Sequence, residues 1–448
     1  MAGELRLTAT PHRLAYQTLP TAQQAYVLLE AMPTEFAPGT GSQPVNFCLV
    51  LDRSGSMAGE KLKCMKEAAI LVVEHLGPKD LLSIVIFDDV NPADLIVPSG
   101  MVQDREVVKR RIEAIEERGG THMSTGMRLG LEELQKGQSA DRVSSMLLLT
   151  DGQTWEDQQT CRDLADQCRT AGIPIYVLGL GVGAESNWDP LLLEDLAQKS
   201  GGDWTAIETP QQAGAIFEKT LQGMQGTAVT NAFLTMRLVK GVTPRTVWRV
   251  TPLISRLDQQ FPGSAQGAES NQGDEGAQRP GSARAVSLHD IQVFLGDIQH
   301  GAGQSILAEV LLPPRPAGLY RFIQADITYD VPGSGITDQK VSVDLTLPFT
   351  DDAVQASQTE ARLMNIIERV VAHKLQTQAL DEAAAGNAAK ATQKLRAAAT
   401  RLLELGEVEL AQQANQQAQQ IEQDGQIDPA AAQKMRYATK RLTESETE

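Results

Sequence analysis

Three short stretches of the sequence carry side chains whose types suit the binding of a metal ion. Asp52-Arg53-Ser54-Gly55-Ser56 offers a carboxylate and two hydroxyls, Gly119-Gly120-Thr121 offers a further hydroxyl, and Asp151-Gly152 offers a second carboxylate. Hard oxygen donors that carry few charges suit Mg²⁺, or Mn²⁺, better than zinc or copper. The candidate metal ligands are therefore Asp52, Ser54, Ser56, Thr121 and Asp151.

Regular elements are expected to bring these stretches together, because apolar strands alternate with amphipathic helices over residues 45–225. This alternation predicts an α/β unit, with a doubly wound and mostly parallel sheet covered by helices on both faces. Such a sheet binds ligands at the carboxyl ends of its strands, where Asp52 and Asp151 are expected. We expect Asp52 and Thr121 to lie on solvent-facing loops. Strands are predicted at 47–51, 81–87, 146–149 and 175–178, and helices at 62–76, 104–118, 127–134 and 161–171 and after Pro190 and Pro210.

Other interpretations of these motifs were compared with metal binding. The Asp52 to Ser56 stretch could instead form a turn that caps a helix, but the two further loops with oxygen donors favour a metal. Gly179 to Ala184 nearly matches a dinucleotide-binding fingerprint, yet Glu185 and other polar residues separate it from the next helix. It is predicted to be a glycine-rich strand exit. His122 could touch a bound ligand, but a loop histidine without a chemical task is favoured.

The motifs LDRSGSM, GGT and LLLTDG, in this order and on these elements, resemble the von Willebrand factor A (VWA) domain with its metal-ion-dependent adhesion site. The resemblance covers residues 41–226, and Arg53 occupies the variable position of the first motif. It implies that Ser54, Ser56 and Thr121 bind the metal, and that Asp52 and Asp151 bind it directly or through water. In this family the metal usually keeps one position open for a carboxylate of a partner protein.

The flanking segments predict a second domain, into which the α/β unit is inserted. Residues 1–40 and 227–350 contain short alternating apolar runs with Pro and Gly between them, which is typical of an antiparallel β-sandwich. Because the few N-terminal strands cannot be stable alone, we expect them to pair with strands of the later segment. Residues 258–285 are rich in Gly, Ser, Gln, Ala and Glu and predict a mobile loop.

The C-terminal residues 351–448 are rich in Ala, Gln, Glu and Leu and predict a helical segment. Two or three helices are expected, separated at Gly386-Asn387, Gly406 and Gly425. The whole arrangement, with an A domain that interrupts a sandwich and is followed by helices, resembles that of bacterial intracellular A-domain proteins.

Composition and charge limit the classes of partner. The chain carries 57 acidic and 40 basic side chains, a net charge of −17, which argues against nucleic acid. Its apolar runs are too short for a membrane span, and its first residues do not resemble a secretory signal, so a cytoplasmic location is expected. The four cysteines are expected to be reduced and buried, because Cys161 and Cys168 lie too far apart on one helix to form a disulfide.

These observations predict a Mg²⁺-dependent protein-binding adaptor or scaffold rather than an enzyme. Its partner would be a protein that presents an Asp or Glu to the metal. Two alternatives stay open, an accessory subunit of an AAA+ ATPase in a remodelling or metal-insertion system, and a metal-dependent hydrolase. The sequence has no GxSxG nucleophile elbow and no Walker loop. A phosphorylated Asp52 would want a second carboxylate at the position of Ser54.

Overall fold

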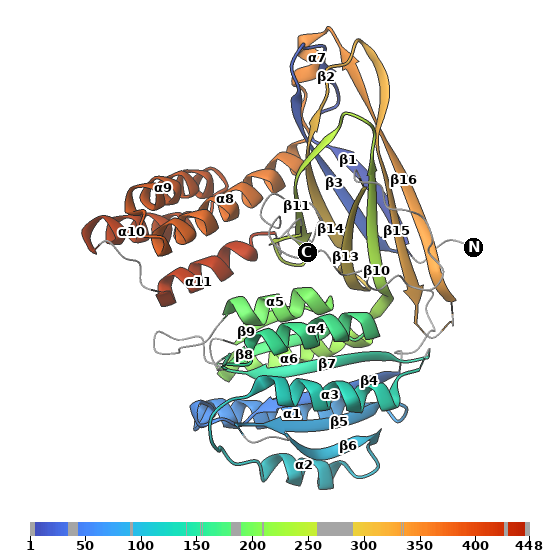
Figure 1. Ribbon diagram of the computed structural model, residues 1–448, viewed down its shortest axis with the longest axis vertical. Coiled ribbons are helices and arrows are strands. Elements are labelled where there is room, and N and C mark those ends of the chain that lie inside the picture. Colours follow the sequence, from blue (N-terminus) through green and yellow to red (C-terminus); the bar gives the residue numbers. More distant parts are fainter. Residues whose placement is uncertain are drawn as a thin grey trace.

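The computed structural model describes residues 5–34, 44–89, 93–139, 141–152, 154, 156–180, 190–207, 210–257, 290–332, 334, 336–424 and 429–443. These residues form an α/β unit, a β-sandwich above it in Figure 1 and a helical C-terminal segment beside both. Within the described part, no helix combines the length and the apolar character that a membrane crossing requires. The predicted loop 258–285, Gly181 to Glu185 at the predicted glycine-rich strand exit, and Gly425 lie outside the described residues.

The α/β unit contains a six-stranded sheet in the order β6-β5-β4-β7-β8-β9. All neighbouring strands in it are parallel except β5 and β6. The predicted doubly wound, mostly parallel sheet is thus confirmed. Strand β6 was not predicted, because it is an edge strand with Pro98 and Gly100 in place of a continuous apolar run. The strands are β4 (Val45–Asp52), β5 (Leu81–Phe87), β6 (Asp94–Met101), β7 (Val143–Thr150), β8 (Ile175–Leu180) and β9 (Trp204–Ile207).

Helices cover both faces of this sheet. Alternate side chains of β4 point to opposite faces, so Phe47, Leu49 and Leu51 pack in one core while Cys48 and Val50 pack in the other. The first core includes α1 (Glu60–His75), α2 (Arg105–Glu113) and α6 (Pro210–Gln225), and the second includes α3 (Met123–Gly137), α4 (Gln158–Ala171) and α5 (Pro190–Ser200).

Helix α2 is shorter than the predicted helix 104–118. Asp104 caps its start, where the carboxylate accepts hydrogen bonds from the backbone of Glu106 and Val107. The helix ends at Glu113, since the residues after it form the loop that leads to the candidate site. In that loop the backbone N–H of Arg118 donates to the carbonyl of Arg53 at 2.8 Å.

The sandwich consists of two five-stranded sheets, in the orders β1-β3-β14-β11-β12 and β13-β10-β15-β16-β2. The N-terminal strand β3 lies between β1 and β14, so the chain starts in the sandwich, enters the α/β unit and returns. This confirms the predicted insertion of the sheet unit into a sandwich. The strands are β1 (Leu5–Pro11), β2 (Tyr16–Gln17), β3 (Gln23–Pro33), β10 (Thr227–Leu238), β11 (Thr243–Thr251), β12 (Ser255–Arg256), β13 (Asp290–Gln299), β14 (Gln304–Leu312), β15 (Gly318–Val331) and β16 (Ile336–Thr350).

The C-terminal segment contains more helices than the two or three expected. Its described residues form α7 (Ala353–Ser357), α8 (Ala361–Ala384), α9 (Ala388–Glu404), α10 (Val408–Asp424) and α11 (Pro429–Lys440). Gly386 and Gly406 adopt positive φ angles of 79° and 81°, and each ends a helix rather than bending it. Leu363 and Ile366 of α8 pack on Trp248 and Val250, so the helices cover the outer face of one sandwich sheet.

Helix α11 joins the α/β unit to the sandwich. Its Tyr437 ring packs against Trp204 of β9 at a centroid distance of 5.1 Å. Lys440 forms an ion pair with Glu194 of α5, and its carbonyl accepts a hydrogen bond from the backbone of Ile254 at 3.0 Å. These contacts fix the position of the α/β unit below the sandwich (Figure 1).

Candidate metal site

Asp52 is the last residue of β4 and is fully buried, with 0% of its surface exposed. Its Oδ1 accepts a hydrogen bond from the backbone N–H of Ser54 at 2.9 Å, and its Oδ2 accepts one from the hydroxyl of Thr150 at 2.6 Å. The expectation that Asp52 and Thr121 face solvent is wrong, since Thr121 is only 6% exposed. The reason is that β4 and β7 are the two central strands, so Thr150 and the adjacent loops cover the carboxylate.

Burial of Asp52 has an electrostatic consequence. Loss of hydration raises the pKa of its carboxyl to about 7, against the hydrogen bonds from Thr150 and Ser54, which lower it, while the nearby Asp151 raises it further. A charged carboxylate at this position is therefore costly without a cation. A cation held beside it would favour the ionised form.

The first loop places two hydroxyls together. Ser54 Oγ and Ser56 Oγ lie 3.1 Å apart, with Ser54 buried and Ser56 exposed. Residues Gly55–Met57 form a short 3₁₀ turn, but the Ser54 side chain makes no capping hydrogen bond to it. The turn that the motif also predicted is thus present, and Asp52 rather than Ser54 supplies its side-chain hydrogen bond.

Hydrogen bonds join the first loop to the second and the second loop to the third. The backbone N–H of Gly55 donates to the carbonyl of Gly119 at 3.0 Å, and the hydroxyl of Thr154 donates to the carbonyl of Thr121 at 3.4 Å. Gly119 has a φ of 66°, and a Cβ there would lie 2.1 Å from a carboxylate oxygen of Asp89. The left-handed backbone at this position favours glycine, which explains Gly119 of the Gly-Gly pair.

Asp151 contributes the second carboxylate. Its Oδ2 lies 2.9 Å from Nζ of Lys61, in the first turn of α1, and the Lys61 side chain is 27% exposed. Its Oδ1 is buried and has no hydrogen-bond partner among the residues that the structure describes. Such an atom is costly unless it is satisfied by a ligand or water. The role of Lys61 could not be predicted from the sequence, because no pattern links this residue to one ninety positions later.

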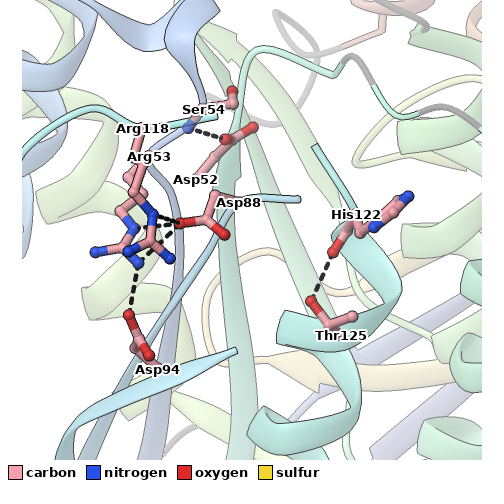
Figure 2. Close-up of polar contacts among 8 residues, drawn as sticks. All are labelled: Asp52, Arg53, Ser54, Asp88, Asp94, Arg118, His122 and Thr125. Atoms are coloured by element: carbon pink, nitrogen blue, oxygen red, sulfur yellow. Dashed lines mark hydrogen bonds and ion pairs between the residues drawn. The ribbon is translucent and has the colours of Figure 1, made fainter. Parts of the chain in front are cut away.

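A third carboxylate near the site, Asp88, was not predicted from the sequence and holds the neighbouring loops in place. Figure 2 shows that the guanidinium groups of Arg53 and Arg118 converge on it. Arg53 Nη2 and Arg118 Nε lie 2.8 and 3.0 Å from Asp88 Oδ2, and Arg53 also pairs with Asp94 at 2.5 Å. The sequence did contain an indication of this residue, since Asp88 directly follows β5, the strand next to β4. Two cations neutralise Asp88, so it orders the loops and is not a free metal ligand.

His122 is adjacent to Thr121, but its ring points away from Asp52 and Asp88 (Figure 2). The backbone of His122 makes its hydrogen bonds to the neighbouring residues. The N–H donates to the carbonyl of Asp88 at 2.9 Å, and the carbonyl accepts from the hydroxyl of Thr125 at 2.8 Å. These contacts suit a loop residue that begins α3.

The donor set fits a hard divalent cation. It combines two buried carboxylates with three hydroxyls, and one carboxylate oxygen is left without a partner. In the described parts of the chain, no cluster of three or more Cys, His, Asp or Glu side chains is placed to hold a metal. Carboxylates, hydroxyls and water positions are typical of Mg²⁺ or Mn²⁺ sites.

Two families match separate parts of the chain. Residues 46–219 match the von Willebrand factor type A domain. Residues 361–445 match the Sll0103-like, C-terminal alpha-helical domain. The first match covers the α/β unit with all five candidate ligands, and the second covers the helices from α8 to α11.

Curated relatives match part of the chain. The uncharacterized protein sll0103 of Synechocystis sp. is 30% identical over 296 residues, which are 66% of this chain and 64% of that protein. Inter-alpha-trypsin inhibitor heavy chain H3 of Homo sapiens is 28% identical over 177 residues, 37% of this chain and 19% of the relative. The chain thus spans just under two thirds of the first relative and about a fifth of the second.

Solved structures share the whole architecture. A von Willebrand factor type A protein from Catenulispora acidiphila superimposes with a TM-score of 0.72 at 16% identity, covering 98% of this chain and 97% of the other. The ArnB paralog VWA2 from Sulfolobus acidocaldarius gives a TM-score of 0.52 at 14% identity, with 99% and 98% covered. At such identities the likeness concerns the fold. Residues 46–219 of this chain are a von Willebrand factor type A domain.

Proposed function

We propose that this protein is a Mg²⁺-dependent adaptor or scaffold, which binds a partner protein through a metal-ion-dependent adhesion site. A VWA domain indicates a protein-interaction or adhesion role. The finer proposal is that Mg²⁺, or Mn²⁺, is held by Asp52, Ser54, Ser56, Thr121 and Asp151. The bound ion would supply a Lewis-acidic position for an Asp or Glu side chain of the partner.

The unpartnered Oδ1 of Asp151 is the observation that carries the proposal. It is a buried acceptor on a buried carboxylate, and the only cation that contacts this carboxylate in the described structure, Lys61, contacts the other oxygen. The two serine hydroxyls, 3.1 Å apart, add neutral donors, which leave the charge of a bound ion incompletely neutralised. Such an ion attracts a further carboxylate, which an acidic side chain of a partner protein would supply.

A binding module is favoured over the other functions considered. Neither the described residues nor the relatives carry an observation that favours an AAA+ ATPase as partner or a hydrolase reaction. The protein is therefore proposed to bind rather than to catalyse. All four cysteines are buried and unpaired, which supports the cytoplasmic location that we propose with this function.

Capture of partner proteins by the tagged full-length chain tests the proposal. Thr121→Ala removes a proposed ligand hydroxyl, and Thr125→Ala is a matched control, because its hydroxyl donates to the carbonyl of His122. We expect the parent and Thr125→Ala to capture the same protein in Mg²⁺ and to lose it in EDTA. Thr121→Ala should fail to capture it in either buffer. Undiminished capture in EDTA and by Thr121→Ala would contradict the proposal.

A further inference from the structure

A second polar site lies where the VWA domain, the sandwich and α11 meet. A cavity of about 900 Å³ opens there, lined by residues of β8, β9, β11, β13, β14, α6 and α11. Cavities that bind small molecules have volumes of this order. None of the five proposed metal ligands lines it. The cavity is therefore separate from the metal site and independent of the function proposed for that site.

Arg249 is the main charged group in the wall of this cavity. Its neighbours on β11, Trp248 and Val250, pack under the C-terminal helices, so the alternation of the strand directs Arg249 to the other face. The side chain is 5% exposed. Its Nη2 donates to the carbonyl of Leu295 at 3.3 Å, while its buried Nε has no partner among the described residues.

Arg249 also forms no ion pair with any described residue. Asp203, on the same wall, attracts it only at longer range, and burial lowers the pKa of the guanidinium. A buried guanidinium without an adjacent anion opposes folding, unless a ligand supplies the negative charge. Lys219 and Arg441 line the same cavity, so its three cationic side chains outnumber the two carboxylates in the lining, Asp203 and Asp297.

Two unpartnered acceptors lie beside Arg249. Gln304 donates from Nε2 to the carbonyls of Leu295 and Asp297 at 2.9 and 3.0 Å, which leaves its buried Oε1 without a partner in the described structure. The buried Oδ2 of Asp297 likewise has none. Arg249 and Gln304 both donate a hydrogen bond to the carbonyl of Leu295. The guanidinium and the two unpartnered acceptors therefore belong to one wall of the cavity.

We propose that this cavity binds a small organic acid that carries a hydroxyl or ammonium group near its carboxylate. The carboxylate would accept hydrogen bonds from the planar guanidinium of Arg249, whose geometry matches two carboxylate oxygens. The hydroxyl or ammonium would donate to Oε1 of Gln304 and Oδ2 of Asp297. Hydroxy acids and amino acids have this combination of groups.

Thermal unfolding and calorimetry of the full-length chain in EDTA test the proposal. The probes are the L-amino acids and the hydroxy acids lactate, malate and citrate, with inorganic phosphate and NaCl at matched ionic strength for comparison. We expect at least one amino or hydroxy acid to raise the Tm of the parent beyond NaCl and to bind with a measurable Kd. Stabilisation by phosphate alone, or by none of the probes, would overturn the proposal and leave a water-filled gap.

Substitutions locate the binding. Arg249→Gln should abolish the stabilisation, whereas Arg245→Gln, on the exposed end of the same strand, should retain it. An Arg249→Gln protein that responds like the parent would overturn the assignment. If Arg249→Gln does not fold, Lys219→Glu replaces it, because Lys219 is exposed and lines the cavity. This variant should weaken binding several-fold, and an unchanged Kd would count against the site.

Discussion

Lys61 Nζ lies 2.9 Å from Oδ2 of Asp151, so the start of α1 brings a cation to a site where the sequence had indicated only oxygen donors. The ammonium partly neutralises the two carboxylates, Asp52 and Asp151. It contacts one oxygen of Asp151 and leaves the other without a partner in the described structure. Since like charges repel, a divalent ion at this site would be opposed by Lys61.

Replacement of Lys61 by Met should therefore have two opposite effects. Without metal, the free energy of unfolding should fall by about 1–3 kcal/mol, because the buried Asp151 loses its ion pair while the part-exposed Lys61 limits the loss. Mg²⁺ should bind more tightly, because the competing charge is gone. Urea unfolding in EDTA and calorimetry with Mg²⁺ measure these changes.

Lys63→Met is the matched control, since Lys63 lies one half-turn further along α1 and is mostly exposed. Its contact with Glu60 at 4.0 Å is a surface ion pair, so stability should change by less than about 0.5 kcal/mol. Weaker Mg²⁺ binding by Lys61→Met, or equal effects of both substitutions, would contradict the role assigned to Lys61.

The N-terminal strand β3 should be essential to the sandwich. Leu29 is fully buried in the sandwich core, so Leu29→Ala should lower the free energy of unfolding by about 2–5 kcal/mol. Leu14 is 57% exposed, and Leu14→Ala should change the free energy of unfolding by less than about 0.5 kcal/mol. Chemical denaturation followed by tryptophan fluorescence measures both. A cost for Leu29→Ala no larger than that for Leu14→Ala would mean that β3 is not held in the sheet.

His12 should make stability depend on pH. Its Nδ1 contacts the backbone N–H of Tyr26 at 3.0 Å and the hydroxyl of Tyr16 at 3.1 Å, and burial lowers its pKa to about 4. Between the unfolded pKa of about 6.5 and this value, only the unfolded chain takes up the proton. The contribution of His12 to the free energy of unfolding is therefore complete above pH 6.5. It decreases as the pH falls below this value, by at most about 1.4 kcal/mol per pH unit.

His12→Asn, which keeps an acceptor but does not titrate, should flatten this acid-side slope. His75→Asn, at an exposed histidine, is the control and should leave the slope of the parent unchanged. Denaturation at a series of pH values from 7 to 4 measures both. An identical slope in the parent and in His12→Asn would show that another group causes the loss.

The parts of the fold that could be predicted are those set by local pattern. The apolar run Phe47 to Leu51 and the helical spacing after it identified the sheet and its layers, and Asp52 and Asp151 were correctly placed at strand ends. Strand β6 escaped prediction because an exposed edge strand needs no apolar run. The helix breaks at Gly386 and Gly406 were predicted correctly, but the expected number of two or three C-terminal helices was too low.

The environment of the site could not be predicted, because it depends on contacts between distant segments. Thr150 makes Asp52 a buried carboxyl only because β4 and β7 are paired. Lys61 reaches Asp151, and Arg53 reaches Asp88, across loops whose packing no short pattern encodes. Spacing identified the donors, whereas tertiary structure determines their charge balance.

Calorimetric titration of Mg²⁺ into the full-length protein tests the metal site most directly, with Asp52→Asn as the altered ligand and Thr125→Ala as the control. The parent and Thr125→Ala should each bind one Mg²⁺ with the same Kd and gain thermal stability as ln(1 + [Mg²⁺]/Kd). Asp52→Asn should show neither the heat nor the gain in stability. No binding of Mg²⁺ or Mn²⁺ to the parent at millimolar concentrations, or equal binding by Asp52→Asn, would contradict the proposal that these five side chains hold a metal.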